Sequence, residues 1–241
     1  MAALALLAIA VADAVSNTDL LNLADACAEL PLLTAGSGVA LGLPPAYAQR
    51  GWFTPSDIAA MVDSVSGPAA VLSGSCSEAT NAQVAVWRTA GRTALLIDPL
   101  ALHQGTQTAD GVLAQAQAAL DQGPVLVYAT AAPESVKAVQ TALGVQAAGD
   151  LVERALAQIA QGLVTGGVRR LVVAGGETSG AVVQALQVAQ LRIGAPICPG
   201  VPWTQAALPG NGEPMLLALK SGNFGGPDFF VQALQQAGVA L

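Results

Sequence analysis

Three segments of the chain place glycine and hydroxyl side chains directly after an apolar run and before a helical pattern. These segments are Ser73–Ser77, Gly175–Ser179 and Ser221–Gly226. Glycine lets the backbone approach an anion closely, and the free N–H groups at the start of a helix point toward it. One such loop is often only a tight turn. Three of them at one edge of a sheet would form a cradle for a phosphate or a nucleotide.

Two charged residues at these loops have open interpretations. Glu177 is the acidic residue inside a glycine-rich loop, where it could bind ribose hydroxyls or a magnesium-bound water, or cap the following helix. Lys220 closes an apolar run just before the third loop. It could contact a phosphate, or it could be a solvated lysine at a strand end.

Other chemistries lack their sequence signatures. No GxxxxGK[ST] string is present, which excludes a P-loop. The segment 36–42 resembles a loosened dinucleotide fingerprint, but its preceding strand is very short and no acidic residue follows at the expected distance. The chain has one histidine, His103, and three widely spaced cysteines without a CxxC pair, so zinc and thiol-redox sites are not supported. We predict no protein metal site.

The composition bounds the class of protein. The chain has 241 residues, of which 53% are hydrophobic and 10% charged, with a net charge of -7. A disordered chain and a duplex nucleic-acid binder are both excluded by these values. Residues 1–15 are apolar like the core of a signal peptide, but no basic residue precedes them and Asp13 interrupts them. We therefore expect a buried strand there and a cytoplasmic protein without membrane contact.

The regular part of the sequence alternates between strand and helix patterns. This alternation predicts an α/β fold with a doubly wound, mainly parallel sheet that has helices on both faces. Strands are expected at 69–73, 93–97, 125–128, 171–174, 191–193 and 215–220, and helices at 16–29, 78–90, 111–122, 133–143, 150–165, 179–186 and 228–236. The proline-rich segment 44–68 predicts an irregular connection with a short helix at 55–62. Trp203 is expected in a turn as an anchoring aromatic, although it could also stack on a purine.

The glycine-rich loops and their neighbours resemble one known family. The strings are LSGSCSEATNAQV (72–84), VYATAAPE (127–134), RRLVVAGGETSGAVVQAL (169–186), ICPGVPW (197–203) and LALKSGNFGGPDFF (217–230). Their order and spacing resemble the carboxyl-terminal half of the four-carbon acid sugar kinases across residues 32–241. GGETSG followed by KSGNFGGPDFF is a specific combination.

The resemblance implies a nucleotide-binding domain over residues 1–241, with ATP and Mg²⁺ as cofactors. The matching motifs imply ATP contacts from Ser73, Gly175, Gly176, Glu177, Thr178 and Gly222. Their chemistry adds the neighbours Ser75, Ser221 and Asn223. The catalytic residue is not identified, because the residues offer no well-placed pair of carboxylates for acid and base.

One departure from the family limits the functional prediction. Family members open with a domain that carries an Asp-Asp-Phe-Thr-Gly-type loop, and this chain has no match to it. That absent domain would bind a 3-oxo-tetronate, erythronate or threonate type of sugar acid. We therefore expect an ATP-binding domain that is inactive by itself. Alternatives are a non-catalytic module for a nucleotide or another anionic metabolite, and, less favoured, a dinucleotide oxidoreductase. The high apolar fraction would suit a homo-oligomer interface.

Overall fold

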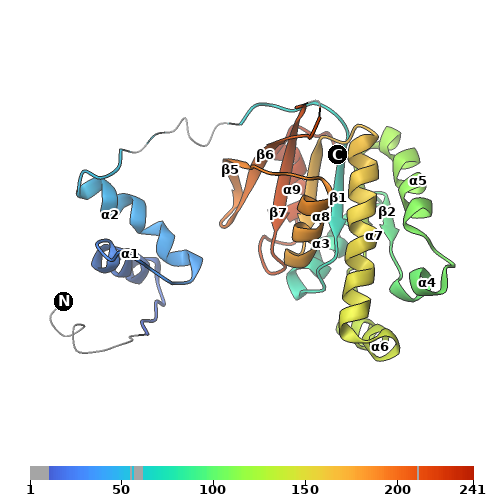
Figure 1. Ribbon diagram of the computed structural model, residues 1–241, viewed down its shortest axis with the longest axis horizontal. Helices are drawn as coiled ribbons and strands as arrows, with labels where there is room; N and C mark the ends of the chain where they lie inside the picture. The colour runs from blue at the N-terminus through green and yellow to red at the C-terminus, as the bar shows by residue number, and fades with distance from the viewer. Residues whose placement is uncertain (1–10, 55, 57–61, 211) are drawn as a thin grey trace. The chain divides into compact units, whose positions relative to one another are not determined.

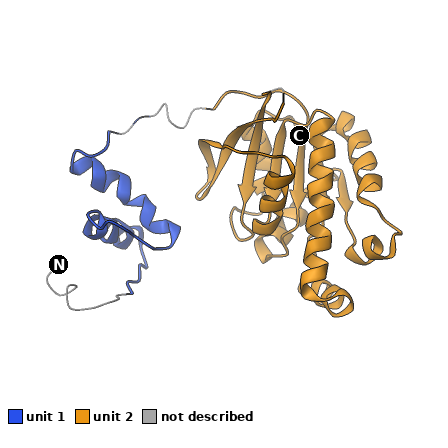
Figure 2. Ribbon diagram, in the orientation of Figure 1, with its two compact units in different colours: residues 1–58 blue, residues 59–241 orange. Residues whose placement is uncertain are grey.

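The computed structural model describes residues 11–54, 56, 62–210 and 212–241. The chain divides into two compact units, residues 1–58 and residues 59–241 (Figure 2). The first unit contains α1 (Asn17–Cys27), a 3-10 helix (Ser37–Leu41) and α2 (Leu43–Gln49). Ser16 and Asp19 form a reciprocal capping box at the start of α1, as the sequence predicts. The guanidinium of Arg50 joins the two helices through a 2.6 Å ion pair with Asp25.

The second unit is a seven-stranded sheet with helices packed on it (Figure 1). Along the chain its elements are β1 (Ala69–Ser73), α3 (Glu78–Thr89), β2 (Ala94–Leu96), α4 (Pro99–Gln104), α5 (Ala109–Ala119), a 3-10 turn (Leu120–Gln122), β3 (Val125–Tyr128), α6 (Pro133–Leu143), α7 (Val145–Thr165), β4 (Arg170–Ala174), α8 (Gly176–Ala185), β5 (Arg192–Cys198), β6 (Val201–Ala207), β7 (Pro214–Lys220) and α9 (Phe229–Gln236).

The strand order is β2-β3-β1-β4-β7-β6-β5. The first five strands of this order are parallel, whereas β6 runs antiparallel to both β7 and β5. The central strands are buried on both sides, because their short apolar runs leave no polar face. The predicted α/β fold with a mainly parallel sheet is confirmed.

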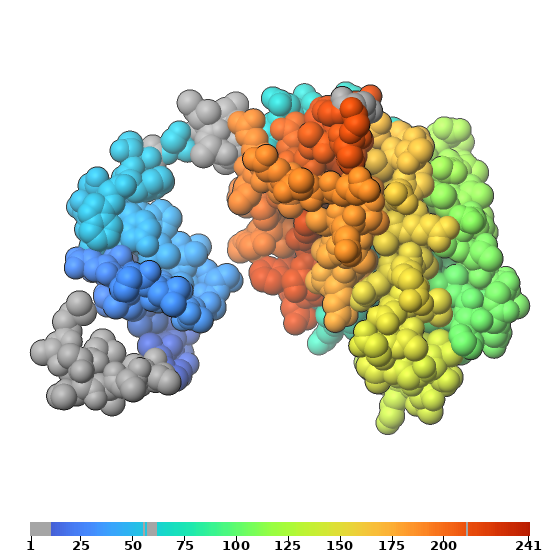
Figure 3. Space-filling view, in the orientation of Figure 1, coloured from blue at the N-terminus to red at the C-terminus, as the bar shows by residue number. Residues whose placement is uncertain are grey.

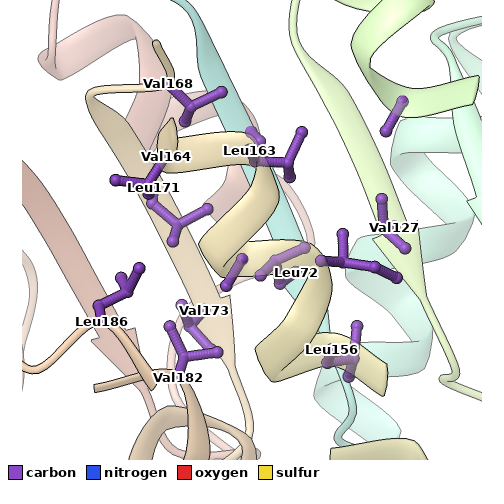
Figure 4. Close-up of a cluster of buried hydrophobic side chains, with 14 of the residues drawn as sticks. Leu72, Val127, Leu156, Leu163, Val164, Val168, Leu171, Val173, Val182 and Leu186 are labelled. Atoms are coloured by element: carbon purple, nitrogen blue, oxygen red, sulfur yellow. The ribbon is translucent and has the colours of Figure 1, made fainter. Parts of the chain in front are cut away.

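Successive residues of the central strands enter two separate cores, since side chains alternate across a sheet. Leu72 and its neighbours on that face pack under α5, α7 and α8 (Figure 4). Val71 and the other alternate residues pack under α3 and α9, where Trp87 and Phe229 are completely buried. In the space-filling view α7 (yellow) and α5 (green) lie side by side on the surface of the second unit (Figure 3). The sheet therefore has helices on both faces, as predicted.

Two expectations about the elements are wrong, and one strand was missed. Residues 11–15 form no strand and are exposed, whereas residues 1–10 of the same expected strand lie outside the described part. Strand β6 was not predicted, and Trp203 lies in this strand, not in a turn. Its indole N–H donates a 3.1 Å hydrogen bond to the carbonyl of Ala233, so the ring is part of the core.

The proline-rich segment is also more regular than the sequence indicates. Residues 43–49 form α2 because Pro44 and Pro45 occupy its first turn, where proline costs no hydrogen bond. The helix expected at 55–62 falls mostly outside the described residues, and of those described, Ser56 and Val62 are not helical. In the part of the chain that the structure describes, no helix is long and apolar enough to cross a membrane.

Candidate functional site

The three glycine-rich loops meet at one edge of the sheet. They follow β1, β4 and β7, which are adjacent and parallel, and the last residues of these strands are in register: Ser73 with Ala174, and Ala174 with Lys220. Parallel strands present their carboxyl ends at the same edge, where open α/β sheets bind ligands. The expectation that the three loops share an edge is therefore confirmed.

Backbone hydrogen bonds tie the first two loops to the next strand. The N–H groups of Gly74 and Ser75 both donate to the carbonyl of Ala174, at 3.0 and 3.2 Å. The N–H of Gly175 donates to the carbonyl of Lys220 at 2.8 Å. A side chain is excluded at Gly74, because a β-carbon there would collide with Oγ1 of Thr178. These glycines are needed for the close packing of the loops.

Hydroxyl groups at the start of α3 bind the third loop. Ser77 accepts from the N–H of Thr80 at 3.2 Å and so caps α3. Ser77 Oγ and Thr80 Oγ1 each donate to the carbonyl oxygen of Gly222, at 2.6 and 2.9 Å. A β-carbon at Gly222 would come within 2.6 Å of Ser75 Oγ, so only glycine lets the loops approach this closely.

One amide holds the rest of the third loop. Gln83 is buried, and its Nε2 lies 3.0 to 3.2 Å from the carbonyl oxygens of residues 224, 225 and 226. Thr80 and Gln83 were not predicted from the sequence. Their three-residue spacing puts both polar side chains on the face of α3 that also carries the core residues Val84 and Trp87. A polar side chain on a buried helix face needs a hydrogen-bond partner inside the protein. This pattern could have identified both residues from the sequence.

A cleft of about 770 Å³ opens beside the first two loops. Its polar side is formed by residues 74–76 and 175–178. The rest of the lining is mainly apolar and comes from the ends of β2 and β3 and from α4, α6 and α7, including Ile97, Val136, Val139 and Val152. A volume in this range suits a ligand of the size of a nucleotide, with a polar end and a flat apolar end.

The amino terminus of α8 faces this cleft. Gly176, Glu177 and Thr178 form the first turn of α8, and all three line the cleft. The N–H groups of a first turn have no partner within the helix, so they are available to an anion. A β-carbon at Gly176 would meet no atom within 4 Å. The space beside the first turn of α8 is therefore open.

Two carboxylates lie at the rim of the cleft. Glu153 of α7 has a pKa above its ordinary value because burial disfavours its charged form and the neighbouring carboxylates of Glu177 and Asp150 repel a second charge. Both Glu153 and Glu177 line the cleft. Their oxygen atoms are the ligand type that Mg²⁺ prefers, although the described residues contain no cluster of three or more candidate metal ligands.

The structure places the residues predicted to contact ATP in two groups. Ser75, Gly175, Gly176, Glu177 and Thr178 line the cleft. Ser73 is completely buried, with its hydroxyl 2.6 Å from that of Thr130, and it does not line the cleft. Ser221, Gly222 and Asn223 belong to the third loop beside Ser75 and Ser77, and they do not line the cleft either.

The family model of the nucleotide-binding C-terminal domain matches residues 70–230. The chain belongs to this family. A 3-oxo-tetronate kinase of Cupriavidus necator is 58% identical over 229 residues, which cover 95% of this chain and 52% of that protein. A 3-oxo-tetronate kinase of Salmonella typhimurium is 39% identical over 230 residues, which cover 94% of this chain and 53% of that protein.

Solved structures agree with this assignment. The crystal structure of a Haemophilus influenzae protein of the family model DUF1537 has a TM-score of 0.73 and 37% sequence identity with this chain. The match covers 93% of this chain and 52% of that protein. The resemblance to the four-carbon acid sugar kinases is thereby confirmed. The chain spans about half the length of the curated relatives it matches.

Proposed function

We propose that the cleft beside the glycine-rich loops binds ATP and that the chain is the nucleotide-binding half of a kinase for four-carbon sugar acids. The family assignment supports a nucleotide, and the relatives named 3-oxo-tetronate kinase support the reaction class. The observation that carries the proposal is the first turn of α8, which presents Gly176–Thr178 to a cleft of about 770 Å³.

In this arrangement the N–H groups of residues 176–178 orient the phosphates, and the helix dipole of α8 favours their negative charge. The base would lie against the apolar wall that contains Val136, Val139 and Val152. Mg²⁺ would neutralise phosphate charge. It would be held mainly by the phosphates, with Glu177 and Glu153 supplying one or two carboxylate oxygens. Four residues predicted to contact ATP do not line the cleft: Ser73, Ser221, Gly222 and Asn223. They would contribute to ATP binding indirectly, by fixing the shape of the loops.

The sugar acid would be bound by parts of the full-length kinase other than these loops. The proposal therefore assigns binding, not turnover, to the 241-residue chain alone. The proposed function differs from that of a dinucleotide oxidoreductase, in which the glycine-rich fingerprint would follow a strand. Residues 37–41 of that candidate fingerprint form a 3-10 helix in the first unit.

Isothermal titration of the chain with ATP, ADP and NAD tests the proposal. We expect ATP and ADP to bind in the presence of Mg²⁺ with one site per chain, and NAD to bind much more weakly. Equal or tighter binding of NAD would contradict the assignment. The absence of any heat with ATP, in a chain whose thermal unfolding is cooperative, would contradict it as well.

A further inference from the structure

Lys220 is a completely buried lysine at the end of β7. Its ammonium donates to Gly222 O at 2.8 Å, to Thr80 Oγ1 at 3.0 Å and to Ser221 O at 3.2 Å. The ring of Phe229 lies with its centroid 5.9 Å from Nζ. The interpretation of Lys220 as a solvated lysine is therefore wrong.

This one residue contacts the second and third loops directly and reaches the first loop through Thr80 of α3. Its backbone carbonyl accepts from the N–H of Gly175, directly before α8. Its ammonium binds the carbonyl of Gly222 in the third loop and the hydroxyl of Thr80, which itself lies 3.2 Å from Ser75 Oγ at the cleft. Polar contacts of 3.0 and 3.2 Å thus link the lysine through the Thr80 hydroxyl to Ser75 on the polar side of the cleft.

The positive charge of Lys220 has no carboxylate partner among the described residues. The three ion pairs found there join other side chains. The groups that face Nζ are a hydroxyl and two carbonyls, which are neutral, an aromatic ring from α9 and the titratable thiol of Cys198 at the end of β5. A buried ammonium without a counter-charge is costly, and an anion bound nearby reduces that cost.

We propose that Lys220 is a positioning residue of the nucleotide site: its hydrogen bonds hold the loops together, and its unneutralised charge favours a polyphosphate in the cleft. This inference rests on the proposed function and adds a residue to it. Burial lowers the pKa of Lys220 to about 8, although the Cys198 thiol acts in the opposite direction. The lysine is therefore charged below that pH and neutral well above it.

The first test compares Lys220→Met with Lys137→Met. Lys137 is the other lysine of the chain and is exposed on α6. We expect Lys220→Met to weaken MgATP binding by about tenfold or more, because a charged hydrogen-bonding group is lost, and Lys137→Met to leave it within about twofold. Between pH 7.5 and 9.5 the affinity of the unmodified chain should fall as Lys220 loses its proton. That fall should be absent in Lys220→Met.

The second test needs no substitution at the site. In a chain labelled with ¹⁵N-lysine, the two side-chain signals are assigned by Lys137→Arg, and the pKa of Lys220 is followed by NMR with and without MgATP. Binding of the anion should raise this pKa. An unchanged pKa at saturating MgATP, or full affinity in folded Lys220→Met, would overturn this inference alone. If MgATP does not bind the unmodified chain, the proposed function and this inference both fail.

Discussion

The hydroxyl of Ser77 donates a 2.6 Å hydrogen bond to the carbonyl oxygen of Gly222, which lies 145 residues further along the chain. This contact joins the loop after β1 to the loop after β7 across the intervening strand β4. The same hydroxyl caps α3 by accepting from the N–H of Thr80. One small side chain therefore connects the start of a helix with a distant loop of the candidate nucleotide site.

Ser77→Ala should lose both contacts. We expect the free energy of unfolding to fall by about 1–3 kcal/mol, the sum of a lost helix cap and a lost hydrogen bond, and MgATP binding to weaken. Thr108→Ala is the matched control, because Thr108 caps α5 by accepting from the N–H of Gly111 at 3.1 Å and lines no cleft. Urea unfolding and calorimetry on both variants measure the difference. Equal effects of the two substitutions on MgATP affinity would contradict the role given to Ser77.

Gly74→Ala should destabilise the fold. Its new β-carbon would collide with Oγ1 of Thr178, a buried and β-branched side chain that cannot easily move aside. We expect a loss of about 1–3 kcal/mol in urea unfolding, the usual cost of overpacking. Gly180→Ala, where a β-carbon meets no atom within 4 Å in the middle of α8, should instead gain about 0.5–1 kcal/mol. An unchanged free energy of unfolding in Gly74→Ala would show that the loops are packed less closely than the contact between Gly74 and Thr178 indicates.

Glu153→Gln should stabilise the chain at neutral pH. The folded-state pKa of Glu153 is raised, chiefly by burial and then by Glu177, so its ionisation above the ordinary glutamate pKa disfavours the folded state. The midpoint of thermal unfolding should therefore rise in the variant at pH 7–8, and the gain should vanish at pH 3.5, where both states are protonated.

Glu134→Gln is the control for this charge effect. Glu134 lies in the first turn of α6, where a helix dipole favours a negative charge, so its removal should lower the midpoint at neutral pH. A lower midpoint for Glu153→Gln at neutral pH would contradict the electrostatic account of the cleft rim.

The 241-residue chain should bind MgATP without phosphorylating a sugar acid. Phosphoryl transfer needs both reactants held in line and shielded from water, and the proposed site assigns contacts to the nucleotide and none to the acceptor. ADP release is measured with 3-oxo-tetronates, erythronate and threonate. Sustained release that depends on one of these acids would show that the chain also binds the acceptor.

Local patterns predicted most of the second unit. The apolar runs at 69–73 and 125–128 gave the buried strands, and the glycines after β1, β4 and β7 marked the edge that carries the loops. The start of α8 was placed at Ser179, but it begins at Gly176. A glycine at a helix start looks like loop in sequence, because glycine is a weak helix former.

What the sequence did not reveal depends on contacts between distant residues. Strand β6 contains Pro202 and pairs antiparallel with β5 and β7, and nothing local distinguishes it from a turn. The burial of Lys220 depends on contacts such as that with Thr80, which lies 140 residues earlier and reaches the lysine only in the folded chain. The exposed segment 11–15 reads as a buried strand because apolar periodicity does not say what covers it.

Calorimetric titration of MgATP into Gly176→Val tests the central claim most directly. A valine at position 176 meets no atom within 4 Å of its β-carbon, so the fold should tolerate it, while its side chain would occupy the space beside the first N–H groups of α8. Gly180→Val, in the same helix and equally unobstructed, is the control. We predict that Gly176→Val loses about 2–4 kcal/mol of binding free energy, on the scale of lost hydrogen bonds to a charged group, and that Gly180→Val binds like the unmodified chain. Full MgATP affinity in a folded Gly176→Val chain would contradict the assignment of the nucleotide to this cleft.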